Sequence, residues 1–312
     1  MNFSEYKVKP KKILMHLPQN DAVFSSLAND DLSKYNFLSN PEKNKLRAEY
    51  MNFVKIIKSE GIEVLFLENF LDDSIIGSES STNPNLVFMR DSSITLPWDP
   101  SVFISTKMSL ESRKNEPKII AQALEALGLN QLDIFEEEDF IEGGDVIPIT
   151  EKDQRILLIA YGRRTNFSAI KKMSSAVIPK YVDKIIALEH TSNALHLDSG
   201  FCVIDKKNIF MLKNIFSEAW VFEHSSIQKD DANNIFSELG FNLHIVSGDE
   251  HLLEEELNWL PLGGSKFITF NLPPHLEKTL EQKTNTSILT IESDEIIKMS
   301  GGAHCLTRPI YL

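Results

Sequence analysis

Apolar residues recur along this chain in two alternating patterns, one typical of helices and the other typical of strands. A short apolar run at Lys12–His16 predicts a first strand. Residues 41–59 predict an amphipathic helix, because apolar side chains recur there at steps of three and four. These side chains are Leu46, Tyr50, Phe53, Val54 and Ile57. Gly61 ends this helix, and the apolar run Ile62–Leu67 predicts the strand that follows it.

The same helix-then-strand pattern occurs four more times. The predicted pairs are Pro117–Leu127 with Leu132–Phe135, Asn166–Val177 with Lys184–Leu188, Asp230–Leu239 with Asn242–Val246, and Pro274–Gln282 with Ser287–Ile291. A glycine stands at three of the five junctions, which fits helix C-capping. The pairs recur at intervals of roughly 45 to 65 residues, at the upper edge of the range that indicates repeats in a ring or an array.

Polar residues follow each predicted strand at an equivalent point of the pattern. The five segments are Asn83–Asp91, Phe140–Asp145, His190–Asp198, Asn258–Gly263 and Gly301–Cys305. Five units closed around an axis would bring these segments together in one central cleft. A doubly wound sheet of unrelated α/β elements explains the same pattern, so the pattern alone leaves both architectures open.

Composition and charge narrow the class of protein. The chain has 312 residues and a formal net charge of −13, which argues against a nucleic-acid footprint. An acidic pocket would instead attract a cationic small molecule. No apolar stretch is long enough to span a membrane and no signal-peptide pattern follows the basic start, so the cytoplasm is the expected location. No Gly-x-Gly-x-x-Gly or P-loop pattern follows a strand, which argues against dinucleotide or nucleotide binding.

Cys305 is the candidate nucleophile. It is one of two cysteines and ends the run Gly301-Gly-Ala-His-Cys305, where two glycines let the backbone approach a small ligand closely. Polar surroundings are typical of reactive thiols, whereas apolar surroundings are typical of structural ones. Cys202 lies in the apolar run Phe201–Ile204 and is predicted to be a core residue. A buried thiol at a tight turn remains the alternative for Cys305.

His196 is the candidate general acid and base for such a thiol, because imidazole titrates near neutral pH. A packed core histidine is the alternative. Glu142 and Asp145 flank two glycines, and a carboxylate there would orient the histidine. Asp91 and Asp198 each end an apolar run, so we expect them at strand ends, where buried carboxylates need a cation or several donors. A guanidinium matches such carboxylates with its planar N–H donors, so the set suggests a cysteine enzyme acting on a guanidino carbon.

Four motifs are spread over nearly the whole chain, in order Phe88-Met-Arg-Asp91, Glu142-Gly-Gly-Asp145, His196-Leu-Asp198 and Gly301-Gly-Ala-His-Cys305. Together they resemble the motifs of the arginine deiminases and related guanidino-group-modifying enzymes. The resemblance implies a five-bladed, pseudo-symmetric α/β propeller, the pentein fold, formed by residues 1–312 as a single catalytic domain. It also implies a compact member, because the chain looks too short before Glu142 to hold the helical insertion of the arginine deiminases.

The resemblance further implies a role for each candidate residue. Cys305 would attack the guanidino carbon while Asp91 and Asp198 hold its nitrogens. His196 would protonate the departing amine and then activate water against a covalent amidino-cysteine intermediate, and Glu142 would hold His196.

The substrate-binding residues that the resemblance implies are Asn85, Arg164, Asp145 and Arg90. Asn85 and Arg164 match positions that bind the amino-acid end of the substrate, although an exposed helix start is the alternative for Arg164. Two positions depart from the family pattern. Arginine deiminases have an arginine five residues before the nucleophile, where this chain has Ser300. A further carboxylate-binding arginine is expected in the stretch 105–116, which offers Arg113 and Lys107 without a clean match.

We therefore expect hydrolysis of L-arginine or a close relative to a ureido product and ammonia, with no metal or organic cofactor. Within the same chemistry, an amidinotransferase, a dimethylarginine-type hydrolase and an enzyme taking arginine or citrulline to ornithine stay open. Two other classes stay open: a metallohydrolase using His190, His196, Asp198 and His304, and a non-catalytic propeller such as the ribosome anti-association factor. The expected partner is a small guanidino or ureido amino acid, with no nucleic acid and no membrane. A homodimer also stays open, because rings of this size often pair.

Overall fold

The computed structural model of the chain describes residues 2–17, 32–71, 83–191, 194–246 and 257–312. Within these residues the strands form five sheets. Each sheet contains the same arrangement, a central strand with one parallel and one antiparallel neighbour. The periodic pattern of the sequence therefore corresponds to a repeated strand arrangement.

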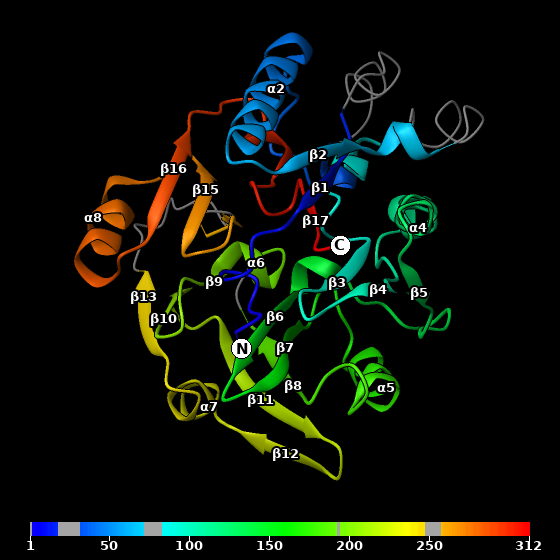
Figure 1. Cartoon of the computed structure of the whole chain (residues 1–312), viewed down its shortest axis with the longest axis vertical. Helices are drawn as coiled ribbons and strands as arrows, with labels where there is room; N and C mark the ends of the chain where they lie inside the picture. The colour runs from blue at the N-terminus through cyan, green and yellow to red at the C-terminus, as the bar shows by residue number, and fades with distance from the viewer. Residues whose placement is uncertain (1, 18–31, 72–82, 192–193, 247–256) are drawn as a thin grey trace.

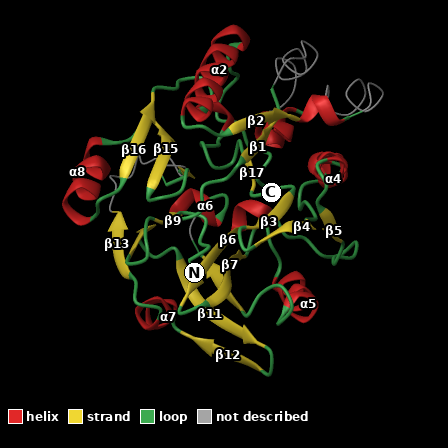
Figure 2. Cartoon of the chain, viewed as in Figure 1, coloured by secondary structure: helices red, strands yellow, loops and turns green. Residues whose placement is uncertain are grey.

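A helix links each central strand to its parallel neighbour, as a parallel pair requires a long crossover. The central strands are β1 (Lys12–Met15), β4 (Asp99–Ser105), β7 (Gln154–Tyr161), β10 (Asn208–Leu212) and β15 (Lys266–Phe270). The helices are α2 (Lys43–Ser59), α4 (Glu116–Ala126), α5 (Phe167–Val177), α7 (Ala232–Glu238) and α8 (Pro274–Lys283). The parallel neighbours are β2 (Glu63–Phe66), β5 (Asn130–Leu132), β8 (Lys184–His190), β13 (Asn242–Val246) and β16 (Ser287–Ile291). Figure 2 shows these five helices outside the strands.

The antiparallel neighbours matter most for the site, because short functional segments lead into them. They are β17 (Arg308–Ile310), β3 (Ser93–Leu96), β6 (Val146–Glu151), β9 (Phe201–Val203) and β14 (Leu260–Pro261). Strand β17 comes from the C-terminus but pairs with β1, with Lys12 opposite Ile310. Strands β11 (Phe216–Glu223) and β12 (Ser226–Asp230) extend the third sheet beyond β8. Both chain ends lie toward the middle of the view in Figure 1.

The five predicted helix-then-strand pairs are confirmed, with one strand misplaced. The strand of the second pair was expected at Leu132–Phe135, but the observed strand β5 ends at Leu132. Its position is fixed by pairing with β4, where Val102 lies opposite Asn130, and the local apolar run does not reveal that pairing. The glycines at the three junctions have the positive φ of helix C-caps: Gly61 (73°), Gly128 (89°) and Gly240 (89°).

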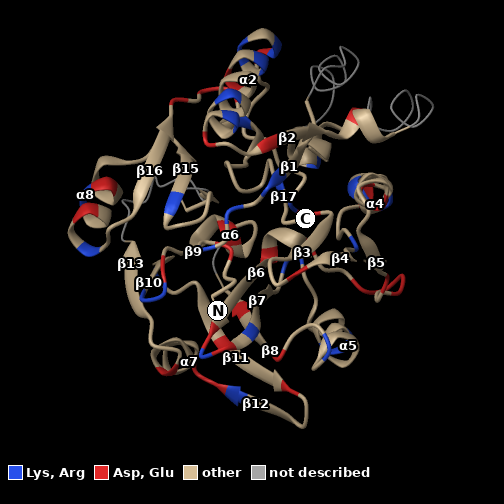
Figure 3. Cartoon of the chain, viewed as in Figure 1, with Lys and Arg blue, Asp and Glu red and all other residues tan. Residues whose placement is uncertain are grey.

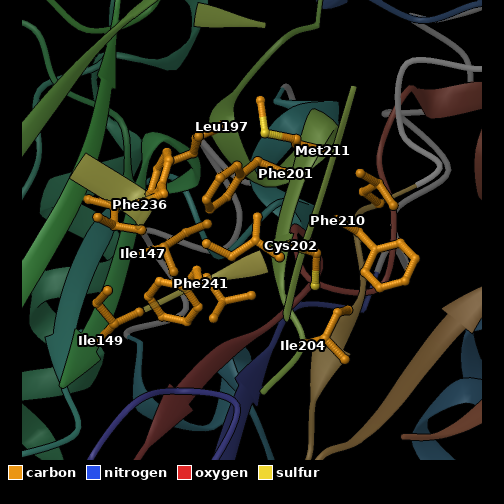
Figure 4. Close-up of a cluster of buried hydrophobic side chains, with 14 of the residues drawn as sticks. Ile147, Ile149, Leu197, Phe201, Cys202, Ile204, Phe210, Met211, Phe236 and Phe241 are labelled. Atoms are coloured by element: carbon orange, nitrogen blue, oxygen red, sulfur yellow. The ribbon is translucent and has the colours of Figure 1, made fainter. Parts of the chain in front are cut away.

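The core forms where each helix covers its sheet. The predicted apolar face of α2 is buried in full, namely Leu46, Tyr50, Phe53, Val54 and Ile57. Cys202 lies among apolar side chains of β9 and its neighbours, including Phe201 and Phe210 (Figure 4). Burial raises the pKa of the Cys202 thiol far above its usual range. Cys202 is therefore a core residue, as predicted.

The charged residues suit a solvent-facing exterior. Basic and acidic residues are interspersed along the outer helices α2 and α8 (Figure 3). None of the described helices combines the length and the apolar character that crossing a bilayer requires.

The N-terminal segment ties two sheets together near the middle of the fold. The backbone N–H of Glu5 donates to Pro148 O of β6 at 3.2 Å, and the N–H of Gly264 donates to Lys7 O at 3.2 Å. The side chain of Ser4 accepts from the backbone N–H of Thr150 at 2.8 Å. These contacts bring the Glu5 side chain to the polar centre described next.

Candidate active site

The candidate site is assembled from segments that each lie just before the antiparallel strand of a different sheet. The residues are Asp91 before β3, Glu142 before β6, His196 and Asp198 before β9, Asn258 before β14, and Cys305 before β17. All of them are buried. The equivalent placement predicted for the five polar segments is thus observed. Asp91 and Asp198, however, precede strands and do not end them.

Glu142 holds His196 from one side. Its Oε2 lies 2.8 Å from His196 Nε2. Its Oε1 accepts from the backbone N–H and the hydroxyl of Ser109, at 2.9 and 2.8 Å, and lies 3.4 Å from Arg164 Nη1. Burial alone would raise the pKa of the Glu142 carboxyl, but the hydrogen bond and charge of His196, together with Arg164, hold it well below its usual range. Glu142 is therefore ionised and fixed in place.

The other ring nitrogen of His196 faces Asp91. The two atoms, Nδ1 and Oδ1, lie 3.7 Å apart, and both are buried without a hydrogen-bond partner. Gly144 leaves the room for this approach, since a Cβ there would lie 2.8 Å from Asp91 Oδ1 and 2.9 Å from His196 Nδ1. Burial lowers the pKa of His196, but the charge of Asp91 and the bond to Glu142 outweigh it and raise the pKa to about 9. His196 is therefore an imidazolium at neutral pH, with one N–H free to act.

Asp91 is fixed through its second oxygen. Arg113 Nη1 donates to Asp91 Oδ2 at 2.8 Å, while Nε and Nη2 of the same guanidinium bind Glu116 at 2.8 and 2.7 Å. Burial disfavours the Arg113 cation, but the two carboxylates outweigh that effect and raise its pKa well above the usual range. The network leaves one Asp91 oxygen held and the other directed toward His196.

Cys305 lies between Asn258 and Asp198. Asn258 Nδ2 donates to the sulfur at 3.0 Å, and Asn258 Oδ1 accepts from the backbone N–H of Cys305 at 3.0 Å. The two Asp198 oxygens lie 3.7 and 3.9 Å from the sulfur. Gly302 permits this packing, because a Cβ there would lie 2.6 Å from Asn258 Oδ1.

A second buried histidine supports Asp198. This histidine is His304, whose Nδ1 lies 2.6 Å from Asp198 Oδ2. The other ring nitrogen of His304 lies 3.5 Å from Glu5 Oε2. Arg90 closes the network by donating to Glu5 Oε1 at 2.6 Å and to His304 O at 3.3 Å. Burial favours the neutral acid, but the hydrogen bond and charge of His304 hold the pKa of Asp198 below its usual range.

The residues predicted to bind substrate make contacts within the protein. Asn85 Nδ2 donates to Tyr35 O at 3.0 Å, while its Oδ1 is buried without a partner. Asp145 accepts from the Thr165 hydroxyl at 2.6 Å and from the backbone N–H of Leu197 at 3.0 Å, and burial raises its pKa to about 7. Arg164 is buried against Glu142, which excludes the exposed helix start considered as an alternative.

Three contributors were not identified from sequence: Asn258, Ser109 and Glu5. Asn258 begins one of the five polar segments that follow the predicted strands. The repeated pattern therefore predicted its general position, but it did not predict its contact with the sulfur of Cys305. Ser109 and Glu5 lie outside every motif. Their contacts span 33 and 299 residues of sequence, to Glu142 and His304, so local patterns carry no signal for them.

A metal can be considered at one place among the described residues. Asp91, Glu142 and His196 offer ligand atoms within 4.8 Å of one another. Arg113 and Arg164 already supply positive charge to the two carboxylates, which disfavours a divalent cation there. This group shares only His196 with the set considered for a metallohydrolase.

Comparisons with known proteins identify relatives of this chain. The family model described as arginine deiminase matches residues 80–311. A Bacillus subtilis protein named "Uncharacterized protein YkgA" is 27% identical over 262 residues, which is 84% of this chain and 79% of that protein. The arginine deiminase of Streptococcus sanguinis is 21% identical over an alignment covering 96% of this chain and 95% of its own.

Solved structures with the same fold are also found. The N-terminal domain of ArgZ, described as an arginine dihydrolase from cyanobacteria, superposes with a TM-score of 0.70 at 15% identity, covering 96% of this chain and 97% of that domain. A dimethylarginine dimethylaminohydrolase superposes with a TM-score of 0.67 at 15% identity, covering 96% and 99%. AgrE gives a TM-score of 0.71 at 15% identity, and this chain spans 39% of its length. With the family model covering most of the chain, the protein belongs to the arginine deiminase family, within the pentein superfamily of guanidino-group-modifying enzymes.

Proposed function

We propose that the protein is a cysteine-dependent hydrolase that converts L-arginine or a close relative to a ureido product and ammonia. One observation carries this proposal. Segments that lead into strands of four different sheets bring two buried groups of side chains to the site. One group is the sulfur of Cys305 with the carboxylate of Asp198, and the other is His196 with Glu142 and Asp91.

Two carboxylates are suited to hold the guanidinium. Asp91 has a buried oxygen without a hydrogen-bond partner, and Asp198 lies beside the nucleophile. A planar cation between them would satisfy both, because a guanidinium presents paired N–H donors. The same cation would favour the thiolate of Cys305 by its charge. Substrate binding and nucleophile activation are thereby coupled.

The reaction then follows in two steps. The sulfur lone pair of Cys305 attacks the guanidino carbon, the C–N bond to the departing nitrogen breaks, and the imidazolium of His196 gives that nitrogen a proton. Neutral His196 next removes a proton from water, whose oxygen attacks the carbon of the amidino-cysteine. The C–S bond breaks and the thiolate leaves, while the remaining proton of the attacking water passes to solvent as the C=O bond forms. This gives the ureido product, and His196 is again an imidazolium.

The amino-acid end of the substrate is assigned by weaker contacts. The buried Asn85 Oδ1 is suited to accept a hydrogen bond from an ammonium, and Arg164 is the proposed partner of a carboxylate. Asp145 and Arg90 make their contacts with protein groups, so we assign them a positioning role. The Ser300 hydroxyl is buried without a partner where other arginine deiminases have an arginine, so this end is the place to expect a difference in substrate choice.

Conversion of arginine through to ornithine is the second candidate. The N-terminal domain of ArgZ, described as an arginine dihydrolase, superposes on 96% of this chain over 97% of its own length. An amidinotransferase and a dimethylarginine-type hydrolase remain further candidates within the same chemistry.

The fold, location and assembly complete the proposal. We interpret the five repeated sheets as the blades of a pseudo-symmetric α/β propeller formed by residues 1–312 as one catalytic domain. A cytoplasmic location and a homodimer stay predictions.

The test is incubation of the pure protein with a panel of guanidino compounds. The panel contains arginine, agmatine, methylarginines, citrulline, and arginine with glycine, and the assay follows ammonia, urea, citrulline and ornithine. Citrulline plus one ammonia per arginine supports the deiminase, whereas ornithine with two ammonia molecules supports the dihydrolase. Turnover of none of these compounds would remove the substrate assignment, and activity that survives Cys305→Ser would remove the mechanism.

A further inference from the structure

Asn258 grips the proposed nucleophile at two atoms. Its Oδ1 accepts from the backbone N–H of Cys305, and its Nδ2 donates to Cys305 Sγ, each at 3.0 Å. A backbone N–H can only donate, so the oxygen of the amide must face it, which leaves the NH₂ group facing sulfur. The orientation of this amide is therefore fixed by the protein.

The sulfur needs a donor at this place. Cys305 is 4% exposed, and burial disfavours a thiolate. The Asp198 carboxylate at 3.7 Å disfavours it further by like charge until a cationic substrate is bound. A donated N–H hydrogen bond opposes both effects, because donors to an anion stabilise the charged form.

The surroundings of Asn258 hold it for this contact. Asn258 is 1% exposed and its Nδ2 also lies 3.4 Å from Asp198 O. Its backbone oxygen accepts from the N–H of His304 at 3.4 Å. The segment before β14 is thus joined to the segment before β17 through both side-chain and backbone contacts.

We propose that Asn258 is a further catalytic residue, whose side-chain N–H stabilises the Cys305 thiolate. This rests on the proposed function for the reaction itself. The hydrogen bond weakens while the sulfur lone pair is used to form the C–S bond. It strengthens again when water has attacked and the thiolate leaves the amidino carbon. Asn258 therefore assists the second step most, where sulfur is the leaving group.

The substitution Asn258→Asp separates the catalytic role from a structural one. It keeps an oxygen to accept from the Cys305 backbone but replaces the N–H donor by a carboxylate. Asn258→Ala removes both contacts without adding charge. The matched control is Asn208→Asp, which makes the same chemical change at a buried asparagine whose side chain contacts Asp205 and His244, outside the site.

The experiment measures the rate of Cys305 alkylation by iodoacetamide against pH, by intact mass, without substrate. Cys202→Ala is the background, so that Cys305 is the thiol that reports. Loss of a hydrogen bond to an anion is expected to move the midpoint of alkylation upward by about one to two pH units in Asn258→Asp and in Asn258→Ala. Asn208→Asp is expected to keep the midpoint of the background. In turnover, Asn258→Asp should lower kcat by more than it changes KM.

Two results would overturn the proposal. A midpoint in folded Asn258→Asp that stays with the background means that the asparagine is structural. If Asn258→Asp does not fold, an unchanged midpoint in Asn258→Ala has the same meaning. Because alkylation needs no substrate, a shifted midpoint in a protein that turns over no guanidino compound leaves Asn258 established and removes only the proposed function.

Discussion

Two buried histidines of the candidate site each lie between two carboxylates, yet their surroundings differ. His196 is tightly bound to Glu142 through Nε2, while Nδ1 faces Asp91 across 3.7 Å without a hydrogen bond. His304 is tightly bound to Asp198 through Nδ1, and its second nitrogen reaches Glu5. One imidazole therefore keeps an N–H open, and the other has both nitrogens engaged.

The difference separates proton transfer from positioning. A general acid must reach the departing group, so it needs a nitrogen that no protein group occupies, and His196 has one. A ring whose two nitrogens are each held by a carboxylate keeps its position but has no nitrogen open toward a substrate. His304 is suited to hold Asp198 beside the sulfur, although it is the residue adjacent to Cys305 in sequence.

The largest expected effect comes from removing the open imidazole. His196→Gln should lower kcat by about 10²–10⁴-fold, the range of general acid–base catalysis. His304→Gln keeps one donor toward Asp198, and it should lower kcat by only about tenfold, the value of one hydrogen bond to a charged group. Steady-state kinetics on the best substrate of the panel measures both. Equal losses in the two variants would contradict the assignment of roles.

The next effect concerns pH. In the proposed mechanism the imidazolium of His196 is the acid of the first step, so kcat should fall as the pH rises through about 9, the pKa of His196 in the folded protein. Glu142→Gln removes one of the groups that raise this pKa, and the alkaline limb should move toward neutral pH. A pH–rate profile of both proteins checks this. A limb at the same pH in both would show that Glu142 does not set the protonation of His196.

The same pKa predicts a change in stability with its sign. Because the pKa of His196 rises from 6.5 to about 9 on folding, its contribution is fully present below pH 6.5 and is lost as the pH rises through 9. Denaturant unfolding should therefore show a steeper loss of stability from pH 6.5 to 9 in the parent than in His196→Gln. If the free energy of unfolding changed with pH in the same way in both proteins, His196 would not be a stabilising imidazolium in the folded state.

A smaller effect is expected from removing Glu5, which contacts His304, the imidazole with both nitrogens engaged. Glu5→Ala leaves Arg90 buried without its partner and should lower the free energy of unfolding by about 3–5 kcal/mol. The folded pKa of Glu5 lies well below its ordinary 4.5, despite burial, because of Arg90 and His304, so this contribution is present above pH 4.5 and is lost on acidification. The control Glu63→Ala removes an exposed partner of Lys12 and should cost about 0–1 kcal/mol. A Glu5→Ala cost as small as that of the control would mean that the network is not coupled.

The smallest effect is expected at the second thiol. Cys202→Ala removes a core sulfur among apolar neighbours and should leave kcat within about twofold, since the thiol makes no part of the proposed reaction. Kinetics and melting temperature are measured together. A large fall in kcat with unchanged melting would place Cys202 in the chemistry.

Much of the fold and of the candidate site could be predicted from the sequence, because most of the site residues lie in recognisable motifs. The apolar periodicity of residues 41–59 and the glycines after the helices gave the repeated units. Equivalent positions after each unit then predicted that Asp91, Glu142, His196 and Cys305 lie together. The structure places Glu142 and Asp91 beside His196, and Asp198 beside the sulfur of Cys305.

The residues that contact these motifs from other parts of the chain could not be predicted in the same way. Glu5 reaches His304 across 299 residues, and Asn258 reaches Cys305 across 47, so packing between units decides them. Strand β5 was misplaced for the same reason, since its ends depend on pairing with β4. The sequence pointed to His196 as the acid and base, but it carried no signal that one of its nitrogens stays without a hydrogen bond, because that depends on contacts made across sheets.

The most direct test of the account is to trap the covalent intermediate. The protein is mixed with arginine labelled with ¹³C at the guanidino carbon, quenched in acid during turnover, and digested for peptide mass spectrometry. The account predicts the labelled amidino group on the peptide that contains Cys305, and none in Cys305→Ala. Label on Cys202, or full turnover with no label on either cysteine, would contradict it.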